Sequence, residues 1–247
     1  MVLSEISTDG LKFKIDFPRE DNNCPVEGRA LLLLSKHNEK EPRFQITDSD
    51  STGFVFGVDV IGKQSSKFVT IDGEIFGYPI SSLNDIPKGD YWIQGLFHKY
   101  ETFNLKTGHK VKLPMDRGEG QHWYSAPGNF YSKPEKINLD PNKPIMKSIF
   151  LDRVIPPIVP PKDTDYIKHI KIQSKLLTEF WGRPMYLGAH VLLPHGFQNH
   201  PNSKYPLMIF HGHYPEDFSG FRPEPPNPNL EPDYSERFKL KGYNRII

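Results

Sequence analysis

WGRPMYLGAHVLLPHGFQNHPNSKYPLMIFHGHY, residues 181–214, is the stretch that decides which fold class the sequence predicts. It contains two short apolar runs, 186–193 and 206–210, and turn residues flank each of them. Such runs are typical of strands covered on both faces, as in the mostly parallel sheet of an α/β protein, rather than of helices. We therefore expect two buried strands, the second of which ends at His211.

From about Asp165 onward, the runs IKIQSKLLTEFWGRPMYLGAHVLLPHGF and YPLMIFHGH resemble the opening of the enterochelin-esterase-like branch of the α/β-hydrolases. In that family a β-hairpin precedes an L-L-P-x-G-[FY] turn, which is matched here by Leu192, Leu193, Pro194, Gly196 and Phe197. Upstream, GRALLLLSKHNEKEPRFQ, IPKGDYWIQGLFHKY and VKLPMDRGEGQHWYSAPGNFYS resemble the β-sandwich that precedes the hydrolase domain in some large members. The resemblance implies a serine esterase that needs no cofactor.

The resemblance stops before the nucleophile, acid and histidine of the family, and the chain contains no G-x-S-x-G elbow. We therefore assign no catalytic residue in this chain, and Ser219 lacks the flanking glycines of an elbow. What the resemblance does assign is part of an oxyanion loop, with backbone N–H donors among His211, Gly212, His213 and Tyr214. The alternative for Gly212 is a loop glycine that only lets the chain turn.

His211 and His213 also form an H-x-H pair, which on a strand places both imidazoles on one face. A zinc site needs further ligands, and His195 and His200 are the nearest by sequence. We favour histidines that pack or form hydrogen bonds, and we predict neither a metal nor an organic cofactor.

Short strands separated by turn residues fill the chain before residue 155. Residues 11–17 alternate, with Leu11, Phe13, Ile15 and Phe17 on one face, which predicts a half-buried strand. Further candidate strands are 30–34, 54–61, 68–71, 91–97 and 145–154. Short strands at this spacing predict an antiparallel, Ig-like β-sandwich. The expected fold is therefore mainly β, with the first strands of an incomplete α/β-hydrolase domain after the sandwich.

A proline cluster, IPPIVPP at residues 155–161, marks a predicted boundary. Proline favours extended polyproline geometry and continues neither a helix nor a central strand. We therefore expect a β-sandwich domain at 1–154, a proline-rich linker at 155–163 and the N-terminal part of a hydrolase domain at 164–247.

The segment DRGEGQHWYSAPGNFY, residues 116–131, is rich in glycine, aromatic and polar side chains. Such a loop can stack on a sugar or another planar ligand. The candidate ligand residues are Trp123, Tyr124, Phe130 and Tyr131. The alternative is that these aromatic side chains pack against their own or the neighbouring domain.

Composition limits the class of protein. Apolar residues at 36% and charged residues at 25% are typical of a globular protein, and the single cysteine, Cys24, excludes an intrachain disulfide. The net charge of +1, with no block of Lys and Arg, gives no reason to expect a nucleic acid or an acidic membrane as partner.

No apolar stretch has the length of a membrane span, and the N-terminus MVLSEISTDG lacks the basic and apolar parts of a secretory signal. We expect a soluble protein, either cytoplasmic or exported if a signal was removed.

Together these observations predict the N-terminal part of a serine esterase that acts on a small-molecule ester and is inactive as this chain alone. The alternative is a stand-alone β-sandwich that binds a ligand or partner without catalysis. In both cases the exposed strands of an incomplete domain would favour association.

Overall fold

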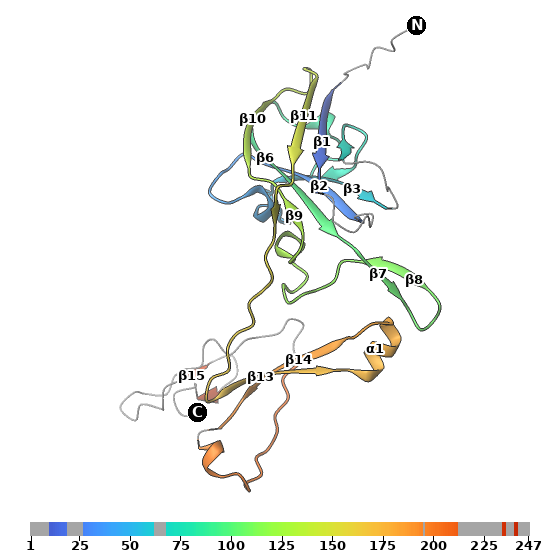
Figure 1. Ribbon diagram of the computed structural model, residues 1–247. Coiled ribbons are helices and arrows are strands. Elements are labelled where there is room, and N and C mark those ends of the chain that lie inside the picture. Colours follow the sequence, from blue (N-terminus) through green and yellow to red (C-terminus); the bar gives the residue numbers. More distant parts are fainter. Residues whose placement is uncertain are drawn as a thin grey trace. The chain divides into compact units, whose positions relative to one another are not determined.

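The computed structural model describes residues 10–18, 27–61, 68–194, 196–211, 234–235 and 240–241, and this described chain is mainly β (Figure 1). It divides into two compact units. The first comprises Met1–Thr102 and Val111–Ile158, and the second comprises Phe103–Lys110 and Val159–Ile247. Residues 156–163, the proline-rich segment, are exposed and have no regular secondary structure. The assignment of 103–110 to the second unit is a feature that the sequence did not predict.

The first unit contains a three-stranded sheet in the order β11–β1–β4. Its strands are β1 (Leu11–Asp16), β4 (Phe68–Ile71) and β11 (Ile145–Phe150). β1 pairs with β4 in antiparallel fashion but with β11 in parallel, so that Leu11 lies opposite Ile145 and Asp16 opposite Phe150. The sheet therefore joins the beginning of this unit to its end.

The second sheet of this unit has seven strands. Six follow the order β12–β9–β6–β2–β3–β5, and the seventh, β10, also pairs with β6. Their bounds are β2 (Gly28–Ser35), β3 (Phe54–Val60), β5 (Gly77–Tyr78), β6 (Gly89–Lys99), β9 (Phe130–Tyr131), β10 (Glu135–Leu139) and β12 (Arg153–Val154). All of these pairings are antiparallel.

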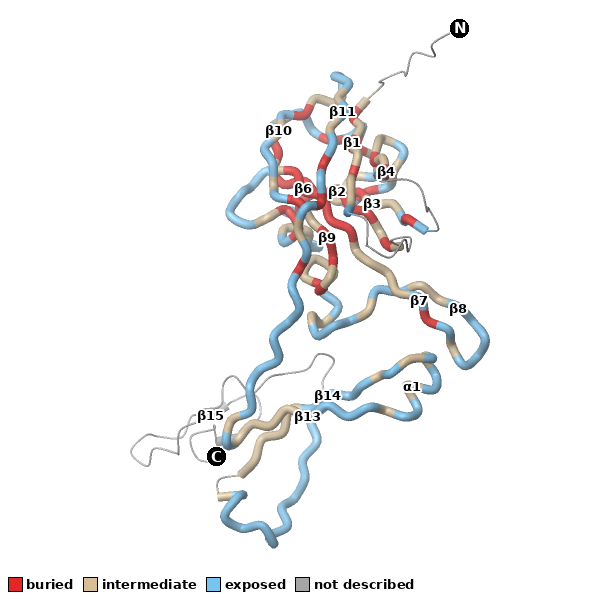
Figure 2. Tube along the Cα trace, in the orientation of Figure 1, coloured by how far each residue is buried: buried red, intermediate tan, exposed pale blue. Residues whose placement is uncertain are grey.

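Buried residues of both sheets form one hydrophobic core, and Figure 2 shows them gathered in the strands of this unit. Phe13 and Ile15 enter this core from β1, and Tyr91, Ile93 and Phe97 enter it from β6. Gly95 of β6 faces the same core. A Cβ at this position would lie 2.7 Å from Leu151 Cδ2 and 3.0 Å from Ile149 Cγ2. The missing side chain therefore lets the two sheets come close together.

The opposite face of the seven-stranded sheet is covered as well. Leu31, Leu33 and Leu96 form a second cluster there, and Ile46, Val55, Trp123 and Tyr131 pack against it. Two loops with short 3-10 turns, η1 (Pro42–Phe44) and η3 (Trp123–Ser125), lie in the segments that supply this cover. A third turn, η2 (Leu83–Asp85), contributes Leu83 to the main core. Because β2 is covered on both faces, its run 30–34 is apolar throughout.

Five of the predicted strands are confirmed, at 11–17, 30–34, 54–61, 68–71 and 91–97, with ends that differ by a few residues. The predicted strand at 145–154 consists of two strands, β11 and β12, in different sheets. Between them, Leu151 donates its N–H to the Asp16 carbonyl at 2.9 Å and its side chain is buried. The chain therefore leaves one sheet at Leu151 and joins the other.

The second unit is built on an antiparallel hairpin. β13 (Ile167–Gln173) and β14 (Tyr186–Leu192) pair over their full length, and the helix α1 (Lys175–Trp181) lies between them in sequence. Ser174 caps the helix by accepting a hydrogen bond from the Leu177 N–H at 3.3 Å, and Gly182 ends it at φ 66°. Local chemistry thus accounts for both ends of this helix.

Three smaller elements complete the described chain. β7 (Glu101–Asn104) and β8 (Lys110–Leu113) form a two-stranded sheet, and β15 (Tyr234–Ser235) pairs with β16 (Leu240–Lys241). The turn η4 (Phe197–Asn199) follows β14. Within the second unit, Trp181 packs edge-on against Phe103 at 5.3 Å between ring centroids.

Two expectations about the second unit are wrong. β14 is a strand, but it is not buried: Tyr186 is 49% and Leu187 55% exposed. Residues 206–210 have no regular secondary structure, and all of them are exposed. A strand covered on both faces needs neighbouring strands for its backbone and other layers for its side chains, and within the described residues only β13 lies beside β14.

Candidate functional site

The predicted oxyanion loop lies almost entirely outside the described residues. His211 is exposed in a segment without regular structure, whereas Gly212, His213 and Tyr214 are not described, and neither is Ser219. Among the histidines considered as metal ligands, His200 is exposed and His195 lies outside the described residues. In the part of the chain that is described, no group of three His, Cys, Asp or Glu side chains is placed to hold a metal ion.

A small cluster that the sequence did not predict lies on the hairpin of the second unit. His169 on β13 and His190 on β14 are opposite each other, with ring centroids 4.8 Å apart. The Asp163 carboxylate accepts the His169 backbone N–H at 2.9 Å and lies 3.1 Å from its Nδ1. The backbone bond and the side-chain bond from His169 lower the pKa of Asp163. Asp163 therefore orients His169.

The four aromatic candidates of the 116–131 loop all contact their own unit. Trp123 and Tyr131 pack on the second cluster, and Phe130 lies in the main core with its ring 6.5 Å from that of Phe97. Tyr124 packs edge-on against Phe44 at 5.5 Å. These contacts correspond to the packing alternative, and ligand binding by the four side chains stays a prediction.

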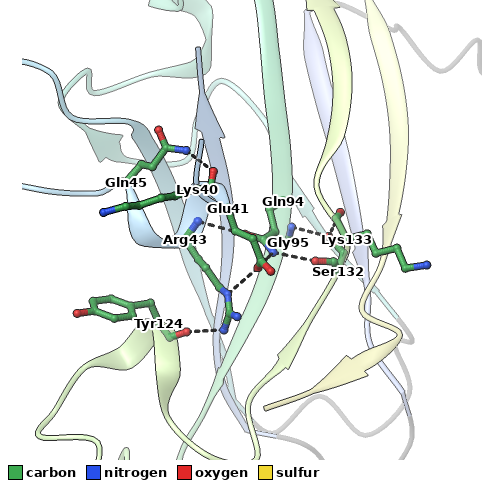
Figure 3. A network of polar contacts seen from close by, with 9 residues as sticks. All are labelled: Lys40, Glu41, Arg43, Gln45, Gln94, Gly95, Tyr124, Ser132 and Lys133. Carbon is green, nitrogen blue, oxygen red and sulfur yellow. Dashed lines mark hydrogen bonds and ion pairs between the residues drawn. The ribbon is translucent and has the colours of Figure 1, made fainter. Parts of the chain in front are cut away.

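Beneath this loop, polar side chains form the buried network drawn in Figure 3. Gln94, fully buried on β6, accepts the Arg43 backbone N–H at 3.1 Å through its Oε1. Its Nε2 donates to Glu41 Oε2 and to the Ser132 carbonyl, both at 2.8 Å. The Ser132 hydroxyl in turn accepts the N–H of Gly95 at 3.0 Å. Gln94 thus joins the η1 loop to the segment after β9.

Arg43 is the cation of the network. Its Nε donates to Glu41 Oε2 at 2.8 Å, and its Nη1 donates to the Tyr124 carbonyl at 2.8 Å. The guanidinium carbon lies 4.3 Å from the ring centroid of Phe44 and 4.4 Å from that of Tyr131. Ion pairing, hydrogen bonding and cation–π contacts therefore hold Arg43, a residue that is only 9% exposed.

Replacing Gln94 with leucine is expected to lower the free energy of unfolding by at least about 2 kcal/mol. The substitution leaves the Arg43 N–H and the Ser132 carbonyl buried without Gln94, and each unsatisfied group costs about 1–3 kcal/mol. Urea unfolding followed by circular dichroism measures the loss, with the exposed Lys133→Ala variant as control. An unchanged unfolding midpoint in Gln94→Leu would show that the network contributes no stability.

A pocket of about 490 Å³ opens elsewhere in the first unit, at the end of β6. His98–Glu101 form one side, residues 126–129 a second, and Met115, Arg117, Pro157 and Ile158 the rest. Hydrogen bonds fix the wall at 126–129: Asn129 Oδ1 accepts the Lys99 N–H at 3.0 Å, and Gly128 donates its N–H to the Ile155 carbonyl at 2.9 Å. Among the described residues that line this pocket there is no serine, threonine or cysteine.

Burial shifts the pKa values of two side chains in this pocket, and an ion pair joins two others. Burial lowers the pKa of His98, so its imidazole is neutral at pH 7. Burial is also the main cause that raises the pKa of Tyr100, whose hydroxyl donates to Asp59 Oδ1 at 3.3 Å. Arg117 forms an ion pair with Glu101. The pocket thus offers neutral hydrogen-bonding groups beside a paired charge.

The stability of the first unit is expected to depend on pH through His98. Because its pKa is lower in the folded state, the unfolded chain binds the proton more readily. The contribution of neutral His98 to the free energy of unfolding is therefore fully present above the unfolded pKa of about 6.5. It is lost as the pH falls from there toward the pKa of His98 in the folded state. Unfolding free energies at pH 7.5 and pH 5.5 are expected to differ less in His98→Gln than in the wild type. A difference of the same size in both proteins would contradict this role.

No family model, curated protein or solved structure matches the chain. Function must therefore be inferred from the residues and their geometry. None of the helices in the described part of the chain has the length and apolar character needed to cross a membrane.

Sequence reasoning missed the Gln94 network and the pocket at the end of β6. One local signal was present: Gln94 is the only polar residue in the apolar run YWIQGLF, residues 91–97. A polar side chain at such a position must find partners when it is buried. The sequence does not say that these partners are Glu41, Arg43 and Ser132, because they come from distant segments.

Proposed function

We infer that this chain is the front part of a serine esterase of the α/β-hydrolase kind. The first unit would be an Ig-like β-sandwich placed before the catalytic domain, and the second unit would be the opening of that domain. The reaction would be hydrolysis of an ester or related acyl bond of a small molecule.

The observation that carries the inference is the geometry around the L-L-P-x-G-F turn. A β-hairpin, β13–β14, leads into it, as the resemblance implies. Gly196 has φ 73°, in the left-handed region that glycine adopts most easily, and Phe197 donates its N–H to the Pro194 carbonyl at 3.1 Å. The left-handed backbone at position 196 therefore explains why the motif has a glycine there. This agreement supports the family resemblance.

The exposed apolar residues of the second unit support the same inference. Leu207, Met208, Ile209 and Phe210 are each at least 66% exposed. Folded monomers rarely leave such contiguous apolar surface in water, so further polypeptide is needed to cover it. In the proposed protein, the remainder of the catalytic domain supplies that cover.

The proposed chemistry is nucleophilic acyl transfer. A serine attacks the carbonyl carbon, a tetrahedral oxyanion forms, and the alcohol leaves before water releases the acid. Backbone N–H groups near Gly212 would donate to the oxyanion together with the residue after the nucleophile. No described residue of this chain supplies the nucleophile or its base.

The reading frame beyond the codon for Ile247 gives a simple test. We expect it to continue and to encode a G-x-S-x-G elbow, followed by an acidic residue and then a histidine, the chain order of the fold. A stop codon directly after Ile247, or a long continuation without the elbow, would overturn the proposal.

A second candidate function is a binding module without catalysis. The pocket of about 490 Å³ favours it, because its volume falls within the range of about 300–1,000 Å³ that is common for small-molecule sites. Such a module would cover residues 207–210 by self-association. A stop codon after Ile247 together with a dimer in light scattering would support this candidate over the esterase.

A further inference from the structure

Trp92 lies on the face of the seven-stranded sheet that is opposite the main core. Its neighbours Tyr91 and Ile93 are buried in that core, and successive side chains of a strand point to opposite faces. Trp92 shares its face with Gln94, and it lies opposite Ser35 on β2 and Lys136 on β10. The indole thus belongs to the surface that the η1 loop partly covers.

Beside the η1 loop, Trp92 lines a second pocket of about 410 Å³. Pro42 and Pro134 line it as well, and residues 38–41 (Asn-Glu-Lys-Glu) bring the polar groups. The pocket therefore combines an indole and two proline rings with an amide, two carboxylates and an ammonium group. The described residues that line it are all different from those that line the pocket at the end of β6.

The polar side of this pocket is held in place by the buried network. Both the Arg43 and the Gln94 bonds to Glu41 end on Oε2 (Figure 3), so this carboxylate is fixed by groups beneath it. Gln45 Nε2 donates to the carbonyls of His37 and Lys40, which ties down the loop that carries the other polar residues. A site formed in advance loses less conformational entropy when a ligand binds.

Charge decides which ligand class fits. The carboxylates of Glu39 and Glu41 are balanced by Lys40 at the pocket and by Arg43 behind Glu41, which gives two negative and two positive groups. A balanced site has no net attraction for a phosphate, a nucleic acid or a polycation. A neutral ligand with many hydroxyl groups satisfies these polar groups without burying an unpaired charge.

We propose that the Trp92 pocket binds a neutral saccharide, specifically a β-1,4-linked chain of glucose or xylose units. All hydroxyls of these pyranoses are equatorial, so each ring face presents axial C–H bonds that stack on an indole. The rim hydroxyls donate to the Glu39 and Glu41 carboxylates and to the Asn38 amide oxygen. This site lies within the first unit and does not depend on the esterase proposal.

Calorimetric titration of the purified chain with cellohexaose and with xylohexaose tests the site. We expect at least one of them to bind and to change the tryptophan fluorescence. Trp92→Leu keeps an apolar side chain but removes the flat ring, and we expect it to lower the association constant about tenfold or more, as loss of a stacking partner worth about 1.4 kcal/mol would do. Lys133→Ala, an exposed neighbour that does not line the pocket, serves as the matched control and should bind normally.

Asn38→Ala keeps the test decisive if Trp92→Leu does not fold. Asn38 is exposed on the loop, so its truncation should leave the circular dichroism spectrum unchanged while weakening binding several-fold. Absence of binding by both oligosaccharides would overturn the proposal. So would full affinity in a folded Trp92→Leu variant or, if that variant is unfolded, full affinity in Asn38→Ala.

Discussion

Truncation of Phe13 to alanine is expected to lower the free energy of unfolding of the first unit by about 3–5 kcal/mol. Phe13 is fully buried near the centre of β1, where it lies opposite Ile71 of β4 and Lys147 of β11. Its ring belongs to a core built from both sheets, so its removal leaves a cavity that neither sheet can fill alone. Because a domain of this kind is stable by only about 5–15 kcal/mol, the loss is a large part of the total.

Urea unfolding of Phe13→Ala measures this loss directly, and two variants control for other causes. Phe13→Leu keeps most of the buried volume and should lose less than Phe13→Ala. Lys14→Ala changes the opposite face of β1, where the ammonium lies 5.0 Å from the Phe68 ring, and it should lose at most about 1 kcal/mol. A loss below about 1 kcal/mol in Phe13→Ala would contradict a core shared by the two sheets.

The strands of the first unit were predictable because their signals are local. Alternation in residues 11–17 placed Leu11, Phe13 and Ile15 on one face, and all three are buried in the structure. The parallel pairing of β1 with β11 was not predictable. Residues 11–16 and 145–150 lie near opposite ends of the sequence of this unit. Nothing in the sequence of either strand specifies the other as its partner.

Residues 206–210 show the limit of the same reasoning. Their apolar composition predicted a strand, but strand formation requires a neighbour that supplies N–H and C=O partners. The described residues provide no such neighbour for this segment, and its side chains are exposed. Local pattern therefore identified an apolar segment that needs cover, but not whether it is a strand in this chain.

The candidate sites were the least predictable part. Gln94 meets Glu41 across 53 residues, and Arg43 meets Tyr124 across 81 residues. Both contacts depend on how the η1 and η3 loops cover the seven-stranded sheet. The aromatic richness of 116–131 was visible in the sequence, whereas the pocket beside Trp92 required the positions of Pro42 and Pro134.

The prediction with the largest expected effect concerns ester hydrolysis by this chain. If the nucleophile lies outside this chain, the oxyanion loop alone cannot open the covalent route, and loss of the nucleophile costs about 10⁶-fold in kcat in a well-studied serine hydrolase. Partial oxyanion stabilisation also needs an assembled pocket around the reacting carbonyl. We therefore expect the purified 247-residue chain to be inactive at every pH.

Turnover of a short-chain aryl ester tests the serine-esterase proposal most directly. The 247-residue chain should release the aryl alcohol at the solvent rate, and the product of the continued reading frame should release it at least about 10³-fold faster, with loss of activity when its elbow serine is replaced by alanine. Robust turnover by the 247-residue chain that disappears in Ser219→Ala or His211→Ala would contradict the account, as would an inactive product of the continued frame.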